Sequence, residues 1–259
     1  MSPRPRVLLV EDDPSIRRFV ALALEESAVE LLTCETVGEA LGLLDQGGIA
    51  LVITDLMLPG ESGLGLVERL AQWPERIGRA KVVVFSAGIT TEVEERLRSL
   101  QVWRMLRKPA SVLDLDACVS EALALWSQPD GADATREAAS ETNPPSANDT
   151  KSAEAQAIAT HFAGNAPLFR AYRVSCHAQF PHDQAAGDAA AAAGDAGALR
   201  RLGHSLATVL LTLGRPADSA LARALETAAE TQGAAAATAL WQQLKERLSA
   251  PLPDTTPRP

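Results

Sequence analysis

Short apolar runs and amphipathic stretches alternate along the first half of the chain. The apolar runs have strand length, and several are continuously hydrophobic, which is typical of strands buried on both faces of a parallel sheet. They fall at Val7–Val10, Val29–Thr33, Ala50–Thr54, Lys81–Phe85 and Trp103–Leu106. Helical patterns follow them, near Ser15–Glu26, Val37–Gln46, Leu64–Trp73, Thr91–Leu100 and Leu113–Trp126. This alternation predicts an α/β domain over residues 1–127, with a five-stranded, parallel, doubly wound sheet.

The pattern changes after Trp126. Residues 128–152 are rich in Pro, Ser, Thr, Asn and Asp and have almost no large apolar side chain, which predicts a flexible linker. Residues 153–250 are alanine-rich and helical in pattern, and five or six helices there predict an all-α bundle. Helix breaks are expected near Gly164–Pro167, Pro181, Gly194, Gly214–Pro216 and Gly233. Residues 251–259 are expected to form a disordered tail.

Composition and charge narrow the class of protein. The hydrophobic fraction of 46% and the charged fraction of 22% fit a globular protein. The net charge of −9 argues against a nucleic-acid partner bound through a basic surface. No apolar run approaches the ~18 residues of a membrane span, so we expect a cytoplasmic protein with no membrane partner. Cys34, Cys118 and Cys176 lack metal-ligand or redox spacing and are expected to be reduced packing residues.

Polar residues stand where the predicted strands end. The four positions are the Glu11-Asp12-Asp13 run after the first strand, Asp55 after the third, Ser86 after the fourth and Lys108 after the fifth. The carboxyl ends of parallel strands share one edge of a sheet, so these side chains are expected to converge there. Taken singly, each also fits an ordinary role, such as a helix cap or a turn.

The chemistry of such a cluster points to phosphoryl transfer. Several carboxylates on one rim repel one another unless a hard cation lies among them, and Mg²⁺ prefers oxygen ligands. The cation would neutralise phosphoryl oxygens while an oxygen of Asp55 attacks in line. Ser86 and Lys108 would hold the remaining phosphoryl oxygens.

The motifs VLLVEDDP, ITDLMLPGESG, VVVFSA and RKPA are specific, and residues 6–126 resemble the receiver domain of two-component response regulators. The resemblance implies a flavodoxin-like fold and a cytoplasmic phosphoacceptor that is not itself a kinase. The residues it implies are Asp55 as phosphoacceptor, Ser86 as switch hydroxyl, Lys108 as the family's lysine, and Glu11, Asp12, Asp55 and the backbone carbonyl of Met57 as Mg²⁺ ligands.

Two positions depart from or extend that pattern. Met105 stands where the family usually has an aromatic switch residue, and methionine cannot make a tyrosine's hydrogen bond. Acceptor chemistry is expected to survive this change, whereas the usual switch is in doubt. Asp13 lies one place beyond the usual acidic pair, where it either helps indirectly or begins the next helix.

The segment GALRRLGHSLATVLLTLG has one apolar stripe at helical spacing, formed by Leu199, Leu202, Leu206, Val209, Leu210 and Leu213. His204 projects from nearly the opposite side, which predicts an exposed imidazole. Its neighbours on that side are Arg200, Arg201, Ala207, Thr208 and Leu211. An exposed histidine is usually ordinary surface, but arginines beside an apolar patch suit a docking surface around a nucleophile.

Residues 158–248 resemble a histidine phosphotransfer domain. The resemblance rests on Leu206 and Gly214, two and ten places after His204, and on AAAAAGDAGALRRLGHSL, ALARALE and FAGNAPLFRAY. It implies that His204 is a second phosphoacceptor. His161, His177 and His182 match no acceptor position and are expected to be surface or linker-proximal residues.

The match has two departures. Ala207 and Thr208 replace the lysine and glycine that the family often has there, so a positive charge is missing and a β-branched side chain fills space. Arg200 or Arg201 would have to supply the charge from the preceding turn.

Two functions of different classes remain. In the first, the chain is a phosphorelay protein with a histidine kinase or another phosphotransfer protein upstream; His204 exchanges phosphate with Asp55 or with another receiver. In the second, the helical domain is a degenerate, unphosphorylated module of a phosphorylation-gated adaptor. A DNA-binding output domain is disfavoured because no Lys/Arg-rich recognition helix is present, and a kinase because no Gly-rich nucleotide loop is present. Oligomeric state and direction of phosphoryl flow stay open.

Overall fold

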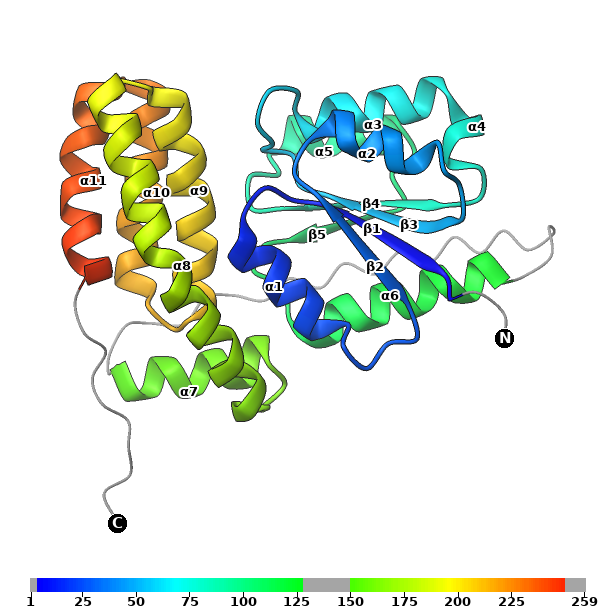
Figure 1. The fold of residues 1–259 in the computed structure, drawn as a ribbon, viewed down its shortest axis with the longest axis horizontal. Helices are drawn as coiled ribbons and strands as arrows, with labels where there is room; N and C mark the ends of the chain where they lie inside the picture. The colour runs from blue at the N-terminus through cyan, green and yellow to red at the C-terminus, as the bar shows by residue number, and fades with distance from the viewer. Residues whose placement is uncertain (1–3, 128–149, 250–259) are drawn as a thin grey trace, which may run out of the picture.

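The computed structural model describes residues 4–127 and 150–249, here called the α/β domain and the helical domain (Figure 1). Most of the predicted linker and the whole predicted tail lie outside the described residues. Residues 150–152, assigned to that linker, already belong to a helix.

The α/β domain is built on five parallel strands in the order β2-β1-β3-β4-β5, which confirms the predicted sheet. The strands are β1 (Arg6–Val10), β2 (Glu30–Cys34), β3 (Ile49–Thr54), β4 (Lys81–Ser86) and β5 (Arg104–Arg107). Alternate residues of β1 enter different cores, with Val7 and Leu9 on one face of the sheet and Leu8 and Val10 on the other. Both faces are therefore covered, as the continuous apolar runs predict.

Two layers of helices cover the sheet (Figure 1). The helices on one face are α1 (Pro14–Ala23) and α6 (Val112–Ser127), and those on the other are α2 (Val37–Leu44), α3 (Gly63–Gln72), α4 (Pro74–Ile77) and α5 (Thr91–Ser99). The short α4 is not predicted by the pattern; Pro74 begins it at a position where a missing amide hydrogen costs nothing.

The helical domain contains α7 (Thr150–His161), α8 (Ala166–Ala193), α9 (Ala196–Thr212), α10 (Pro216–Thr231) and α11 (Ala234–Ser249). The helices α8 to α11 run side by side, and α7 lies across one end of them (Figure 1). The predicted bundle is confirmed, but the predicted break at Pro181 is wrong, because Pro181 lies inside α8. Its ring is exposed, while Phe180 and Asp183 beside it are buried. Packing on both sides of Pro181 thus outweighs the lost helical hydrogen bond.

The two domains pack against each other through α1 and α8, and one buried apolar cluster runs through both. At this contact the ring of Phe19 meets the rings of Phe162 and Tyr172 edge-on, with centroid distances of 5.5 and 5.4 Å. We call these three residues, together with Phe169, the interface aromatic cluster. It fixes which face of the helical domain meets the sheet edge.

Two further expectations concern the described residues. Cys34, Cys118 and Cys176 are free and buried, in agreement with a packing role. None of the helices in residues 4–127 and 150–249 is long and apolar enough to cross a membrane.

The contact between α8 and α11 provides a test of the bundle packing. A methyl group on Gly187 would lie 2.2 Å from Cζ2 of Trp241, whereas one on Gly42 of α2 would meet nothing within 4 Å. We expect Gly187→Ala to lower the free energy of unfolding by about 1–2 kcal/mol, because overpacking outweighs the gain in helix propensity. Gly42→Ala should raise it by up to about 1 kcal/mol. Urea unfolding followed by circular dichroism measures both, and equal stabilities would contradict this packing.

Candidate functional site

The carboxyl ends of the strands bring four predicted residues to one edge of the sheet. Asp55, directly after β3, is 2% exposed, and its backbone nitrogen donates to the carbonyl of Val10. Glu11, Ser86 and Lys108 follow or end the neighbouring strands and are also buried. The sequence-predicted convergence therefore exists in the fold.

Lys108 joins two of the carboxylates. Its Nζ donates to Oε2 of Glu11 at 2.6 Å and to Oδ2 of Asp55 at 2.7 Å. The side chains of all three are 0–2% exposed. The single ammonium of Lys108 is therefore shared by two buried carboxylates. When both carboxylates are ionised, the cluster has a net charge of −1.

The pKa values follow from that imbalance. Burial raises the pKa of Glu11 to about 8 in spite of the ammonium of Lys108. Burial also acts to raise the pKa of Asp55, but the charges of Lys108 and His204 outweigh it and lower that pKa. The two carboxylates raise the pKa of Lys108, although burial opposes them. Asp55 is therefore the carboxylate that stays ionised, as a nucleophile must.

Local contacts fix the loops that carry these groups. Asp13 caps α1 by accepting hydrogen bonds from the backbone nitrogens of Ser15 and Ile16, so it begins the helix, as one of its two predicted roles requires. Arg17 donates to the carbonyls of residues 11 and 12 at 2.8 and 2.9 Å. After β3, a Cβ on Gly63 would lie 1.7 Å from the carbonyl oxygen of Asp55, so only glycine lets α3 begin there.

The carboxylates have the ligand chemistry that Mg²⁺ needs. Asp12 is half-buried, and burial, with the charges of Asp13 and Asp55, raises its pKa to about 6, which shows how crowded the negative charge is. Within residues 4–127 and 150–249, no three acidic, His or Cys groups converge closely enough to hold an ion in this arrangement. The donors fit a hard cation, and the ammonium of Lys108 contacts only one oxygen of Glu11 and one of Asp55.

Two other predicted positions in the α/β domain have clear surroundings. Oγ of Ser86 is buried without a hydrogen-bond partner, so a hydroxyl near Asp55 remains available to an incoming group. Met105 is half-buried on β5 and packs against the apolar cluster beneath α2, α3 and α5. Met57 follows Asp55 in the loop and is half-buried.

His204 is not on an exposed face, contrary to the sequence-based prediction. The residue is 2% exposed, and its Nε2 lies 4.0 Å from Oδ2 of Asp55. The apolar stripe of α9 faces the bundle as predicted, and the α/β domain covers the opposite side. A helical projection predicts only the face of α9 that carries the apolar stripe. It does not predict that another domain covers the opposite face.

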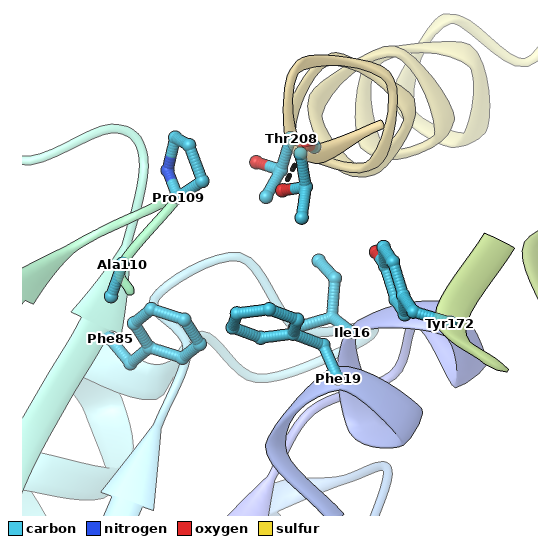
Figure 2. Close-up of a pocket in the computed structure, with 8 residues that line it drawn as sticks. Ile16, Phe19, Phe85, Pro109, Ala110, Tyr172 and Thr208 are labelled. Atoms are coloured by element: carbon cyan, nitrogen blue, oxygen red, sulfur yellow. Dashed lines mark hydrogen bonds between the residues drawn. The ribbon is translucent and has the colours of Figure 1, made fainter. Parts of the chain in front are cut away.

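Thr208 lies at the same contact (Figure 2). Its hydroxyl is buried without a partner, beside a cavity of about 10 Å³ that is lined also by Phe85, Pro109, Phe19 and Tyr172. That volume is about the space one water molecule needs. Thr208 therefore faces the α/β domain, as predicted for a residue on the docking side.

Arg200 and the other three histidines of the helical domain were also singled out by the sequence. Arg200 pairs with Glu230 of α10 at 3.1 Å, so its charge is engaged there. His161 and His177, predicted to be surface or linker-proximal residues, are half-buried, and His182 is exposed.

Glu226 of α10 was not predicted as a functional residue. Its Oε1 lies 2.9 Å from Nδ1 of His204. The sequence signal was the ALARALE segment, which ends at Glu226, but the pattern does not reveal which residue of α9 it meets. The complete constellation is thus a carboxylate, an imidazole and a second carboxylate, with Lys108 beside the first. Such a constellation suits phosphoryl exchange between Asp55 and His204.

Comparison with known proteins assigns the first half of the chain. Residues 7–120 match the family model of the response regulator receiver domain. The chain is 33% identical over 124 residues to the sensor histidine kinase TmoS of Ectopseudomonas mendocina, covering 48% of this chain and 12% of that protein. It is also 33% identical over 121 residues to the KDP operon transcriptional regulatory protein KdpE of Escherichia coli, covering 45% and 50%.

A solved response regulator receiver domain protein (CheY-like) from Methanospirillum hungatei aligns at 24% identity with a TM-score of 0.43, covering 48% of this chain and 95% of that one. The chain spans half or less of the length of the two curated relatives. The matches therefore concern the α/β domain and do not transfer the relatives' whole activities.

The buried cluster predicts the effect of removing Lys108. Lys108→Met would leave the ionised carboxylate of Asp55 buried without a counter-charge, and we expect a loss of about 3–5 kcal/mol in the free energy of unfolding. Asp55→Asn in the same chain removes that unpaired charge, so the double variant should be more stable than Lys108→Met alone. Urea unfolding at pH 7 measures both variants. A loss below about 1 kcal/mol for the single variant would contradict the proposed pairing.

Proposed function

The N-terminal domain of this chain is a response regulator receiver domain, a phosphoacceptor module of two-component signalling, and on this basis we propose that the chain is a phosphorelay protein. Asp55 accepts a phosphoryl group and exchanges it with His204 of the helical domain. Lys108 and Ser86 bind the phosphoryl oxygens.

One observation carries this proposal: the 4.0 Å between Nε2 of His204 and Oδ2 of Asp55, both buried. Holding a nucleophile and its partner in a fixed, water-poor geometry removes most of the entropic cost of bringing them together. An ion pair of purely structural value would not need an imidazole whose Nε2 is buried without a hydrogen-bond partner. The arrangement therefore supports phosphoryl transfer between Asp55 and His204 more than a contact that only holds the two domains together.

Receiver domains generally bind Mg²⁺, and we assign its proposed ligands here to the side chains of Glu11, Asp12 and Asp55 and the carbonyl of Met57. When bound, the cation neutralises phosphoryl oxygens. Receiver domains are typically cytoplasmic, which supports the same compartment for this chain.

The upstream partner of a receiver domain is a histidine kinase, and a second phosphotransfer protein is an alternative donor. Because Asp55 and His204 are both buried where the domains meet, a donor protein reaches either residue only after the domains separate. In that separated state, His204 would also be accessible to another receiver. No nucleic-acid or membrane partner is proposed.

The second candidate is a phosphorylation-gated adaptor with an unphosphorylated helical domain. Thr208 favours it, because a buried side chain fills space beside the acceptor. The position of Arg200 favours it too, since its pairing with Glu230 engages one of the two arginines, Arg200 and Arg201, that were expected to replace the missing lysine.

Phosphate labelling separates the two candidates. We expect labelled acetyl phosphate with Mg²⁺ to produce alkali-labile aspartyl phosphate first and acid-labile phosphohistidine second in the wild type. Asp55→Asn should lose both, His204→Gln only the phosphohistidine, and EDTA should suppress labelling. Mass spectrometry of the intact and digested chain checks the sites. Labelled Asp55 without phosphohistidine would contradict the relay and favour the adaptor.

The interface aromatic cluster predicts how transfer depends on docking. Phe19→Ala removes the ring that meets Phe162 and Tyr172, so we expect internal transfer to His204 to slow at least tenfold, equivalent to about 1.4 kcal/mol of docking free energy. Labelling of Asp55 by acetyl phosphate should persist or rise, since the site opens. Gly187→Ala, which disturbs α8 on its α11 side, is the matched control, and an equal slowing there would refute the role of docking.

A further inference from the structure

Thr208 brings a hydroxyl group to the face of α9 that the α/β domain covers. The residue is 4% exposed, and its Oγ1 is buried without a hydrogen-bond partner. Burying a hydroxyl without a partner costs folding free energy, so such a group in a native protein calls for an explanation. One explanation is that the hydroxyl pairs with a group that enters the domain contact during function.

The surroundings of Thr208 point to the phosphoryl site. Its side chain is turned toward Phe85 and Pro109, which line the same cavity of about 10 Å³ (Figure 2). Phe85 directly precedes Ser86 in the chain, and Ser86 is a proposed ligand of the phosphoryl oxygens. Pro109 directly follows Lys108, the second proposed ligand. Thr208 therefore faces the two segments that would hold the phosphoryl group.

On the helix side, Thr208 follows the proposed acceptor His204 by one turn. Side chains four residues apart on a helix are neighbours, so both lie on the covered face of α9. Nε2 of His204 and Oγ of Ser86 are also buried without hydrogen-bond partners. Unpaired polar atoms from both domains thus gather at one contact, and a phosphoryl group passing between Asp55 and His204 would provide partners for them.

We propose that the Thr208 hydroxyl binds a phosphoryl oxygen during exchange between Asp55 and His204. The exchange itself rests on the proposed relay function. Arg200, which was expected to bring a positive charge to this face, pairs with Glu230 at 3.1 Å. A hydroxyl held in a buried site is a weaker ligand than a cation, but its hydrogen bond to a charged oxygen is strong and needs no rearrangement.

The transfer step shows what the hydroxyl stabilises. The lone pair of Nε2 of His204 forms the N–P bond while the P–O bond to Asp55 breaks, and that electron pair returns to the carboxylate. The other phosphoryl oxygens carry negative charge throughout. The Thr208 hydroxyl donates to one of them and keeps its own proton. Because this donor belongs to the helical domain, it reaches a phosphoryl group on Asp55 only while the domains are packed together.

Thr212, one turn further along α9, provides a matched control. It lines the same cavity and is also buried, but its hydroxyl donates to the carbonyl of Thr208 at 2.9 Å. Its hydrogen-bonding requirement is therefore met within the helix. Valine keeps the branched shape of threonine without the hydroxyl, so Thr208→Val and Thr212→Val remove the same group from two neighbouring positions.

The first experiment follows labelled phosphate from acetyl phosphate in the full chain. We expect Thr208→Val to slow transfer to His204 about fivefold, and Thr208→Ser to keep the rate within about twofold of the wild type, because the hydroxyl is retained. Thr212→Val should transfer at the wild-type rate. The melting temperature of Thr208→Val should equal or exceed that of the wild type, since an unpaired buried hydroxyl is removed.

Beryllofluoride with Mg²⁺ gives a readout that needs no phosphohistidine, because its fluorine atoms take the place of the phosphoryl oxygens on Asp55. Calorimetry should show binding about fivefold weaker in Thr208→Val than in the wild type and unchanged in Thr212→Val. A Thr208→Val variant that matches the wild type in both transfer and beryllofluoride binding would overturn the proposal. A wild type that never forms phosphohistidine, but binds beryllofluoride more tightly than Thr208→Val, would overturn the relay function and support the contact of Thr208.

Discussion

The packing of α1 on α8 is the contact on which the rest of the arrangement depends. Phe19 is part of the α/β core and at the same time meets Phe162 and Tyr172 of the helical domain. Burial of aromatic surface provides the energy of docking, and the edge-to-face geometry restricts its orientation. Because α9 is held beside α8 in the bundle, this docking also carries His204 to the sheet edge. The approach of His204 to Asp55 thus depends on a hydrophobic contact formed by other residues.

Charge at the docked site is distributed unevenly between the domains. The receiver side has Lys108 between Glu11 and Asp55, and the helical side has Glu226 behind His204. Lys108 contacts Asp55, and Glu226 contacts Nδ1 of His204. The side chain of Lys108 is fully buried whereas that of Glu226 is 22% exposed, so water screens the charge of Lys108 less than that of Glu226.

Packing of the two domains makes Asp55 and His204 inaccessible to other proteins. The arrangement that brings Nε2 of His204 to 4.0 Å from Oδ2 of Asp55 also buries both residues. Under the proposed relay, exchange inside the chain and exchange with another protein need different arrangements of the domains. The relay would then require a docking contact of moderate strength, since one that is too stable would trap the phosphoryl group and one that is too weak would lose the effective concentration.

The sequence by itself determined the strands, most helix limits and the residues at the sheet edge. It did so because strand and helix periodicities are local, and because parallel topology brings strand ends together whatever the side chains are. It failed at Pro181, where packing on either side keeps α8 continuous. Only the tertiary structure decided that His204 is buried, that Arg200 pairs with Glu230 and that Glu226 meets the imidazole. Those facts depend on which helix faces meet across the domains, and periodicity along one helix holds no information about the surface opposite it.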